Sequence, residues 1–299
     1  MKKKTRKKKS ALTGTLKGFS ALVSIVAVAI YFYINPTALN TAFDKLNAGE
    51  QQQTETRVEA PASKEEVKKT DISSKLEIPV DLKGRKEIRI KRIGYTVSYN
   101  NEYKTPYWVA WELKRRETKG DEERMSKFMP DPDLPEPSAD HNDYTNSGYD
   151  RGHMAPAADM KWNKQAMEES FYMSNICPQN PNLNRGDWND LEEKSRQWAK
   201  KYGAVYIACG PIYDTKRPKR IGNNKVAVPH AFYKVILIND KKNPQAIGFI
   251  FPNSAGHKPL KKYMVTVDSV EKRTDIDFFP ALPDEIENRI EAELVQELP

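Results

Sequence analysis

The pattern of apolar and polar positions divides the chain into a long uncharged run, a polar stretch and a large region of short alternating segments. Residues 18–43 carry no charged side chain, and the most apolar part of this run is residues 19–34 (FSALVSIVAVAIYFYI). A run of about 26 residues is long enough to cross a hydrocarbon layer of about 30 Å as a helix. Residues 44–77 that follow are charged, rich in glutamine and without an apolar period, which is typical of a flexible tether.

From about residue 79 the pattern becomes that of a packed domain. Strands are predicted where β-branched and aromatic residues alternate or cluster, at residues 95–99, 107–113, 204–209, 231–238 and 246–251. Helices are predicted at residues 161–170, 187–202 and 283–296. Strands that cluster, with helices interspersed irregularly, indicate an α+β fold with a central, largely antiparallel sheet and flanking helices.

The N-terminal pattern predicts a membrane segment. Seven lysines and arginines lie within the first nine residues, and lysine before the apolar run favours a cytoplasmic N-terminus. We expect a basic cytoplasmic tail (1–17), a transmembrane signal anchor (18–36), a flexible polar linker (37–78) and a catalytic domain (79–299). This arrangement predicts a single-pass protein of a bacterial cell membrane with the domain outside the cytoplasm. The alternative is secretion after cleavage of the segment, since Ala27-Val28-Ala29 has the small-residue pattern of a cleavage site.

Composition changes this picture little. The formal net charge is +8, but removing the seven basic residues of the tail leaves 8 − 7 = +1 for the remaining residues, so the charge alone does not indicate a nucleic-acid partner. The two cysteines, Cys177 and Cys209, exclude a disulfide-rich scaffold. Both lie in apolar contexts, which favours two buried free thiols over a disulfide.

The candidate chemistry gathers in residues 150–196. Asp150-Arg151-Gly152-His153 places a cation beside a titratable base, while His141, His230 and His257 are interpreted as surface or loop residues. An asparagine-rich stretch follows, and neutral amide oxygens suit a hard cation such as Mg²⁺. The helix predicted at 187–202 then places Trp188, Glu192 and Arg196 along one side.

Taken together, these segments resemble the DNA/RNA non-specific endonuclease family, which includes the Serratia-type nucleases and endonuclease G. The resemblance is carried by Asp150-Arg151-Gly152-His153, by Asn184 within LNRGDW, and by Glu192, and it extends from about residue 93 to residue 282. It includes the segments YWVA (107–110), SNICPQ (174–179), GPIY (210–213) and TVDSVEKRT (266–274). The resemblance implies a ββα-metal finger at the active site.

The resemblance also implies a role for each matching residue. His153 corresponds to the general base, Asn184 to the direct protein ligand of Mg²⁺, and Glu192 to a second-shell residue that orients water of the ion's shell. Arg151 and Arg196 match positions that contact phosphate. Arg124 corresponds to a further arginine, with Arg115 and Arg116 as alternatives because the loop after Arg124 differs from the family's. Mn²⁺ is an expected substitute for Mg²⁺.

The implied function is a sugar-non-specific endonuclease that leaves 5′-phosphate and 3′-hydroxyl ends on single- or double-stranded DNA and RNA. A nucleic-acid-binding module without catalysis and a phosphodiesterase for small substrates are the alternatives, and a homodimer is left open. An imidazole base with an ordinary pKa predicts a rate that rises from pH 5 to 7.5. Contacts made mainly to phosphate predict low base selectivity and inhibition by salt.

Overall fold

The structure, a computed structural model, describes residues 75–80, 85–254 and 256–299. The predicted membrane segment and most of the predicted linker lie outside these residues. The strands are β1 (Ile88–Lys91), β2 (Thr96–Asn100), β3 (Thr105–Lys114), β4 (Asp150–His153), β5 (Ile176–Gln179), β6 (Ala204–Ile212), β7 (Arg220–Ile221), β8 (Val226–Ala227), β9 (Ala231–Ile238), β10 (Gln245–Pro252) and β11 (Met264–Val265). The α-helices are α3 (Lys164–Ser170), α4 (Pro181–Arg185), α5 (Asp187–Tyr202), α6 (Val267–Thr274) and α7 (Asp284–Ala292).

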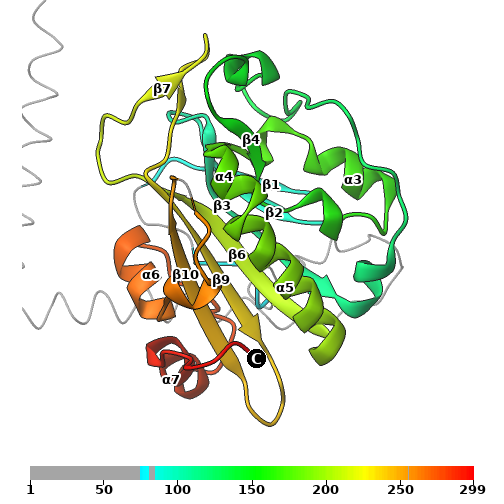
Figure 1. Ribbon diagram of the computed structural model, residues 1–299, viewed down its shortest axis with the longest axis vertical. Helices are drawn as coiled ribbons and strands as arrows, with labels where there is room; N and C mark the ends of the chain where they lie inside the picture. The colour runs from blue at the N-terminus through cyan, green and yellow to red at the C-terminus, as the bar shows by residue number, and fades with distance from the viewer. Residues whose placement is uncertain (1–74, 81–84, 255) are drawn as a thin grey trace, which may run out of the picture. The chain divides into compact units, whose positions relative to one another are not determined.

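Within the described residues, seven strands form one sheet in the order β1-β2-β3-β6-β9-β10-β11, and each neighbouring pair is antiparallel. The prediction of a large antiparallel sheet with flanking helices is therefore confirmed, and all five predicted strands belong to it. Figure 1 shows α5 lying along the sheet, with α6 and α7 beside β10.

Strand β9 faces a separate hydrophobic core on each side of the sheet. Because successive side chains of a strand point to opposite faces, Phe232 and Ile236 join one core while Tyr233 and Val235 join the other. Helix α5 packs into the first core, and α6 and α7 pack into the second. All eight residues of β9 are buried, including Lys234, so this strand runs through the middle of the domain.

Helix α5 forms because its sequence has a helical apolar stripe and well-placed charges at its ends. Trp188, Leu191 and Trp198 are buried on one side, at spacings of three and seven residues. The acidic residues Asp187 and Asp190 lie in the first turn, and lysines lie in the last turn, which complements the helix dipole. Gly203 ends the helix with a φ of 99°.

Several boundaries differ from the prediction. Helix α3 begins at Lys164 rather than 161, because the Asn163 side chain caps it by accepting the Ala166 N–H. Helix α7 ends at Ala292 rather than 296. The elements that were not predicted at all are helices α4 and α6 and strands β1, β4, β5, β7, β8 and β11. Leu76 and Ile78 already pack into the second core, a few residues before the predicted domain start at 79.

Strands β4 and β5 form a separate antiparallel pair that leads into α4 and α5. The pairing places Arg151 opposite Pro178 and His153 opposite Ile176. Gly152 has no room for a side chain, since an added Cβ would lie 2.2 Å from the Gln179 Oε1. The glycine between the arginine and the histidine therefore allows β4 to approach β5 closely.

Candidate active site

Residues from β4, α4 and α5 line a cavity of about 360 Å³ together with Arg124 from the long loop before β4. The cavity wall brings together most of the residues singled out in the sequence. Its lining residues are Arg124, Arg151, His153, Pro156, Ala157, Ala158, Asn184, Arg185, Asn189 and Glu192. A larger cavity of about 480 Å³ lies elsewhere, beside Tyr107 and Tyr213, and no histidine lines it among the described residues.

His153 is held between aromatic rings. Its ring lies 4.9 Å from that of Phe171 and 5.3 Å from that of Phe128, centroid to centroid. The Trp188 indole N–H donates to the His153 backbone carbonyl at 3.3 Å. The His153 Nε2 atom is buried and has no hydrogen-bond partner in the described structure. His153 lines the cavity, so its ring can meet a bound molecule there, whereas the buried Nε2 is shielded from solvent.

The environment of His153 changes the expected pH behaviour. Burial and then the nearby charge of Arg124 lower the pKa of His153 to about 3. The imidazole is therefore already neutral at pH 5. The prediction that its deprotonation raises the rate between pH 5 and 7.5 is wrong in its premise, because that prediction assumed the pKa of a solvated histidine.

Asn184 is oriented by a carboxylate on β4. Its Nδ2 donates to the Asp150 Oδ2 at 2.9 Å, and the same carboxylate accepts two hydrogen bonds of 2.8 Å from the guanidinium of Arg185. Because the amide nitrogen is bonded to Asp150, the oxygen of Asn184 is the atom left to face the cavity. Asp150 thus holds two groups at the cavity wall: the Asn184 side chain, whose oxygen is a candidate metal ligand, and the guanidinium of Arg185.

Glu192 lies on α5, four residues after Trp188 and beside the buried Lys234 of β9. Burial raises the pKa of Glu192 to about 7, although the positive charge of Lys234 acts in the opposite direction. The Lys234 Nζ lies 4.0 Å from the Trp188 ring centroid, which is a cation–π distance. The carboxyl of Glu192 therefore exchanges a proton near neutral pH, whereas His153 does not.

Two of the predicted phosphate-binding arginines line the cavity. Arg124 lies over the Phe171 ring at 5.2 Å, and Arg151 donates to the His141 backbone carbonyl at 3.2 and 2.7 Å. The alternatives considered for Arg124 lie elsewhere, since Arg115 and Arg116 line a different pocket beside Gly203. The geometry thus favours Arg124 among the three.

Arg196 does not line the cavity. Its Nη1 donates to the Asp159 Oδ1 at 2.9 Å, and the Trp111 indole N–H donates to the other oxygen of that carboxylate at 3.1 Å. Asp159 is almost fully buried, so an arginine is needed beside it to offset the cost of burying its charge. In the structure the Arg196 guanidinium pairs with Asp159 and does not line this cavity, and its predicted contact with phosphate stays a prediction.

Lys234 is the residue near the site that the sequence reasoning missed. The signal was present, because a single lysine interrupts the otherwise apolar strand AFYKVILI. Such a lysine is rarely fully buried without a functional or structural reason. The two cysteines are buried and free, as favoured from their apolar contexts.

A cavity that joins a neutral imidazole to three guanidinium groups suits a phosphate diester, so fold and site together define a hydrolase of the nuclease class. The comparisons with known proteins are specific. The chain belongs to the DNA/RNA non-specific endonuclease family, whose model matches residues 73–285.

Named relatives agree with this assignment. The chain is 41% identical over 207 residues to "Nuclease EXOG, mitochondrial" of Xenopus laevis, covering 64% of this chain and 58% of that protein. It is 35% identical over 226 residues to "Nuclease 1, mitochondrial" of Schizosaccharomyces pombe, covering 69% of this chain and 70% of that protein. The chain thus spans about three fifths of the length of the Xenopus relative.

A solved structure shares the fold. A chain in the crystal structure of the EndoG/EndoGI complex superimposes with a TM-score of 0.62 at 30% identity, covering 66% of this chain and 87% of that one. The mixed α/β architecture with its large antiparallel sheet is therefore similar to that of endonuclease G.

The comparisons correct the predicted location. Relatives from Xenopus laevis, Schizosaccharomyces pombe and Homo sapiens carry the names of mitochondrial nucleases, not of bacterial membrane proteins. Within residues 75–80, 85–254 and 256–299, no helix combines the length and the apolar character that crossing a membrane requires. Because of the names of these relatives, the location at a bacterial cell membrane, together with its alternative of secretion, is withdrawn.

Proposed function

We propose that this chain is a Mg²⁺-dependent endonuclease that hydrolyses phosphodiester bonds in DNA and RNA with little base selectivity. One observation carries the proposal: the side chains of His153, Asn184 and Glu192 line the same arginine-rimmed cavity, with the Asn184 amide oriented by Asp150. We assign the nuclease domain to the predicted residues 79–299 together with Leu76 and Ile78, which pack into its second core, and the ββα-metal finger to β4, β5 and the α4–α5 segment that follows them.

The cavity fits a hard divalent cation. Asn184 offers an oxygen because its nitrogen is bonded to Asp150, and Glu192 offers a carboxylate on the same wall. A single direct ligand, Asn184, leaves most of the ion's shell to water, which suits Mg²⁺ because this ion dehydrates reluctantly; Mn²⁺ is the expected substitute. When bound, the ion would stabilise negative charge on the phosphate and on the departing 3′ oxygen.

His153 acts as the general base in this proposal. The neutral imidazole of His153 lines the cavity and accepts a proton from the attacking water, and its low pKa keeps it neutral at working pH. Phe128 and Phe171 pack against the ring and hold it in place. Glu192, in its ionised form, orients water of the ion's shell.

Arg124, Arg151 and Arg185 bind the substrate. The three guanidinium groups face one cavity with Glu192, so a phosphate diester there meets a positive surface. Such contacts carry little base information, which accounts for action on both DNA and RNA and predicts inhibition by salt. Breakage at the 3′ oxygen gives products with 5′-phosphate and 3′-hydroxyl ends.

The direct test is cleavage of plasmid DNA, single-stranded DNA and RNA by the purified chain, with Mg²⁺ and with EDTA. We expect all three substrates to be cut with Mg²⁺ and none with EDTA, and the DNA ends to be ligatable without phosphorylation. The substitution His153→Ala serves as the inactive control. Binding of all three substrates without cleavage would instead identify a binding module, and cleavage of mononucleotide diesters alone a small-substrate phosphodiesterase.

A further inference from the structure

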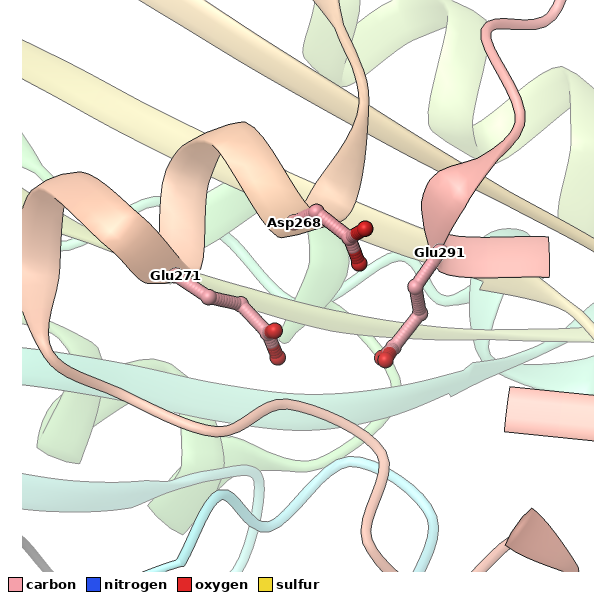
Figure 2. Close-up of side chains that lie close together, drawn as sticks. All are labelled: Asp268, Glu271 and Glu291. Atoms are coloured by element: carbon pink, nitrogen blue, oxygen red, sulfur yellow. The ribbon is translucent and has the colours of Figure 1, made fainter. Parts of the chain in front are cut away.

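A second group of carboxylates gathers on the opposite face of the sheet from the active-site cavity. Asp268 and Glu271 of α6 and Glu291 of α7 each offer an oxygen, and these oxygens all lie within 4.8 Å of one another. Figure 2 shows the three carboxylates gathered between the two helices. Both helices belong to the second core, whereas α5 and the nuclease residues belong to the first.

Glu291 is buried in a way that a free carboxylate does not tolerate. The residue is 4% exposed, and its Oε1 is buried without a hydrogen-bond partner. One turn earlier on α7, the Glu287 Oε1 is in the same condition. Burying an unpartnered carboxylate is costly, so something must compensate these oxygens.

The surroundings of Glu291 supply only negative charge. Burial, followed by Glu271, Glu287 and Asp277, raises the pKa of Glu291 to about 9. No lysine or arginine forms an ion pair with Glu271, Glu287 or Glu291 within the part of the chain that the structure describes. The basic residue of α6 that does form an ion pair, Arg273, turns to Asp214 instead.

We propose that Asp268, Glu271 and Glu291, assisted by Glu287, bind a divalent cation of the Ca²⁺ class and thereby fasten α7 to α6. Every donor is a hard oxygen, which favours Ca²⁺ or Mg²⁺ over transition metals. Ca²⁺ holds oxygens at about 2.3–2.6 Å, so ligands on opposite sides of the ion are about 4.6–5.2 Å apart. The spacing of the three oxygens, up to 4.8 Å, fits within such a shell.

A proton is the competing way to relieve the repulsion. A proton on Glu291 neutralises one carboxylate but leaves the like charges of Asp268 and Glu271 facing each other. A divalent cation compensates all three at once and also supplies the missing partner of the buried Glu291 oxygen. The two explanations differ in one measurable property, which is whether Ca²⁺ binds.

The test is isothermal titration of Ca²⁺ into the full chain carrying Asn184→Ala, so that the proposed nuclease site does not contribute. We expect Ca²⁺ to bind this variant and to raise its melting temperature. Adding Glu291→Gln should weaken the binding at least about tenfold, because Ca²⁺ affinity follows the number of charged ligands. The matched control is Glu285→Gln, an exposed carboxylate on the same helix, which should leave binding unchanged.

The Glu291→Gln protein is expected to fold, since an amide needs no compensating charge, and without Ca²⁺ it should melt at least as high as the parent chain. If the Asn184→Ala chain binds no Ca²⁺, or if Glu291→Gln binds it as tightly as Glu285→Gln does, the proposal is overturned. If the Asn184→Ala chain binds no Ca²⁺ and the Glu291→Gln protein melts higher than the parent chain, a proton is the compensating group. This outcome would also overturn the proposal.

Discussion

The ionisation of Glu192 is expected to determine how the nuclease rate falls toward low pH, which is the acid limb of the pH–rate profile. The substitution that tests this is Glu192→Gln. Burial raises the pKa of this carboxyl to about 7, while the pKa of His153 is lowered to about 3. The group that must lose a proton between pH 5 and 7 is therefore the carboxylic acid. The neutral imidazole is present throughout that range.

The size of the effect follows from the two pKa values. With a pKa of about 7, Glu192 is about one half ionised at pH 7 and about 1% ionised at pH 5, so the rate should fall about 50-fold between them. Over the same range the neutral fraction of His153 stays at about 99% or above. The Glu192→Gln chain cannot ionise at this position and should be slow with a flat profile.

The assay is the initial rate of plasmid nicking from pH 5 to 8 at constant ionic strength, with Mg²⁺ below saturation. Raising Mg²⁺ should move the limb to lower pH, because a nearby cation favours the carboxylate. Glu193→Gln, an exposed neighbour on α5, is the matched control and should keep the limb. The reasoning fails if Glu192→Gln shows the same limb as the parent chain, or if the His153 ring titrates near pH 6.5 by NMR in the metal-free protein.

Three further predictions concern single residues. His153→Ala should lower the cleavage rate at least about 10²-fold with Mg²⁺ present, and near-full activity would remove this residue from its role as base. Lys234→Met should move the acid limb to higher pH, because the lysine charge lowers the pKa of Glu192; an unmoved midpoint in the same assay would contradict this. Phe251→Ala, in the core beside Trp188, should lower the free energy of unfolding by about 3–5 kcal/mol in urea denaturation, whereas a loss below about 1 kcal/mol would contradict the packing described.

The local pattern was sufficient for the long elements. The strands at 204–209 and 231–238 and the helix at 187–202 were predicted because their apolar periods persist over many residues. Strands β4 and β5 were not predicted, since each has four residues and one contains Asp150, Arg151 and His153 rather than a strand pattern. Pairing between segments this short is determined by tertiary contacts, which no local window contains.

The candidate site could likewise be predicted only in part from the local sequence. The residue types predicted a base, an oxygen ligand and phosphate-binding cations, and most of them do line one cavity. The partner of Arg196 could not be read from the helix, because its guanidinium pairs with Asp159, which belongs to another segment of the chain. The pKa of His153 was likewise hidden, since it depends on burial and on Arg124, which lies far away in sequence.

The pleat of β9 has a consequence for how this domain tolerates insertions and deletions. Odd and even positions of the strand serve different interiors, with Lys234 beneath the nuclease cavity and Val235 toward α6 and α7. If the register of β9 slipped by one residue, Lys234 would point toward Phe278 and an aliphatic side chain would lie under Trp188. The packing of both cores would then be disrupted. Insertions or deletions within β9 should therefore be far more damaging than substitutions, because each would disrupt the packing of both cores.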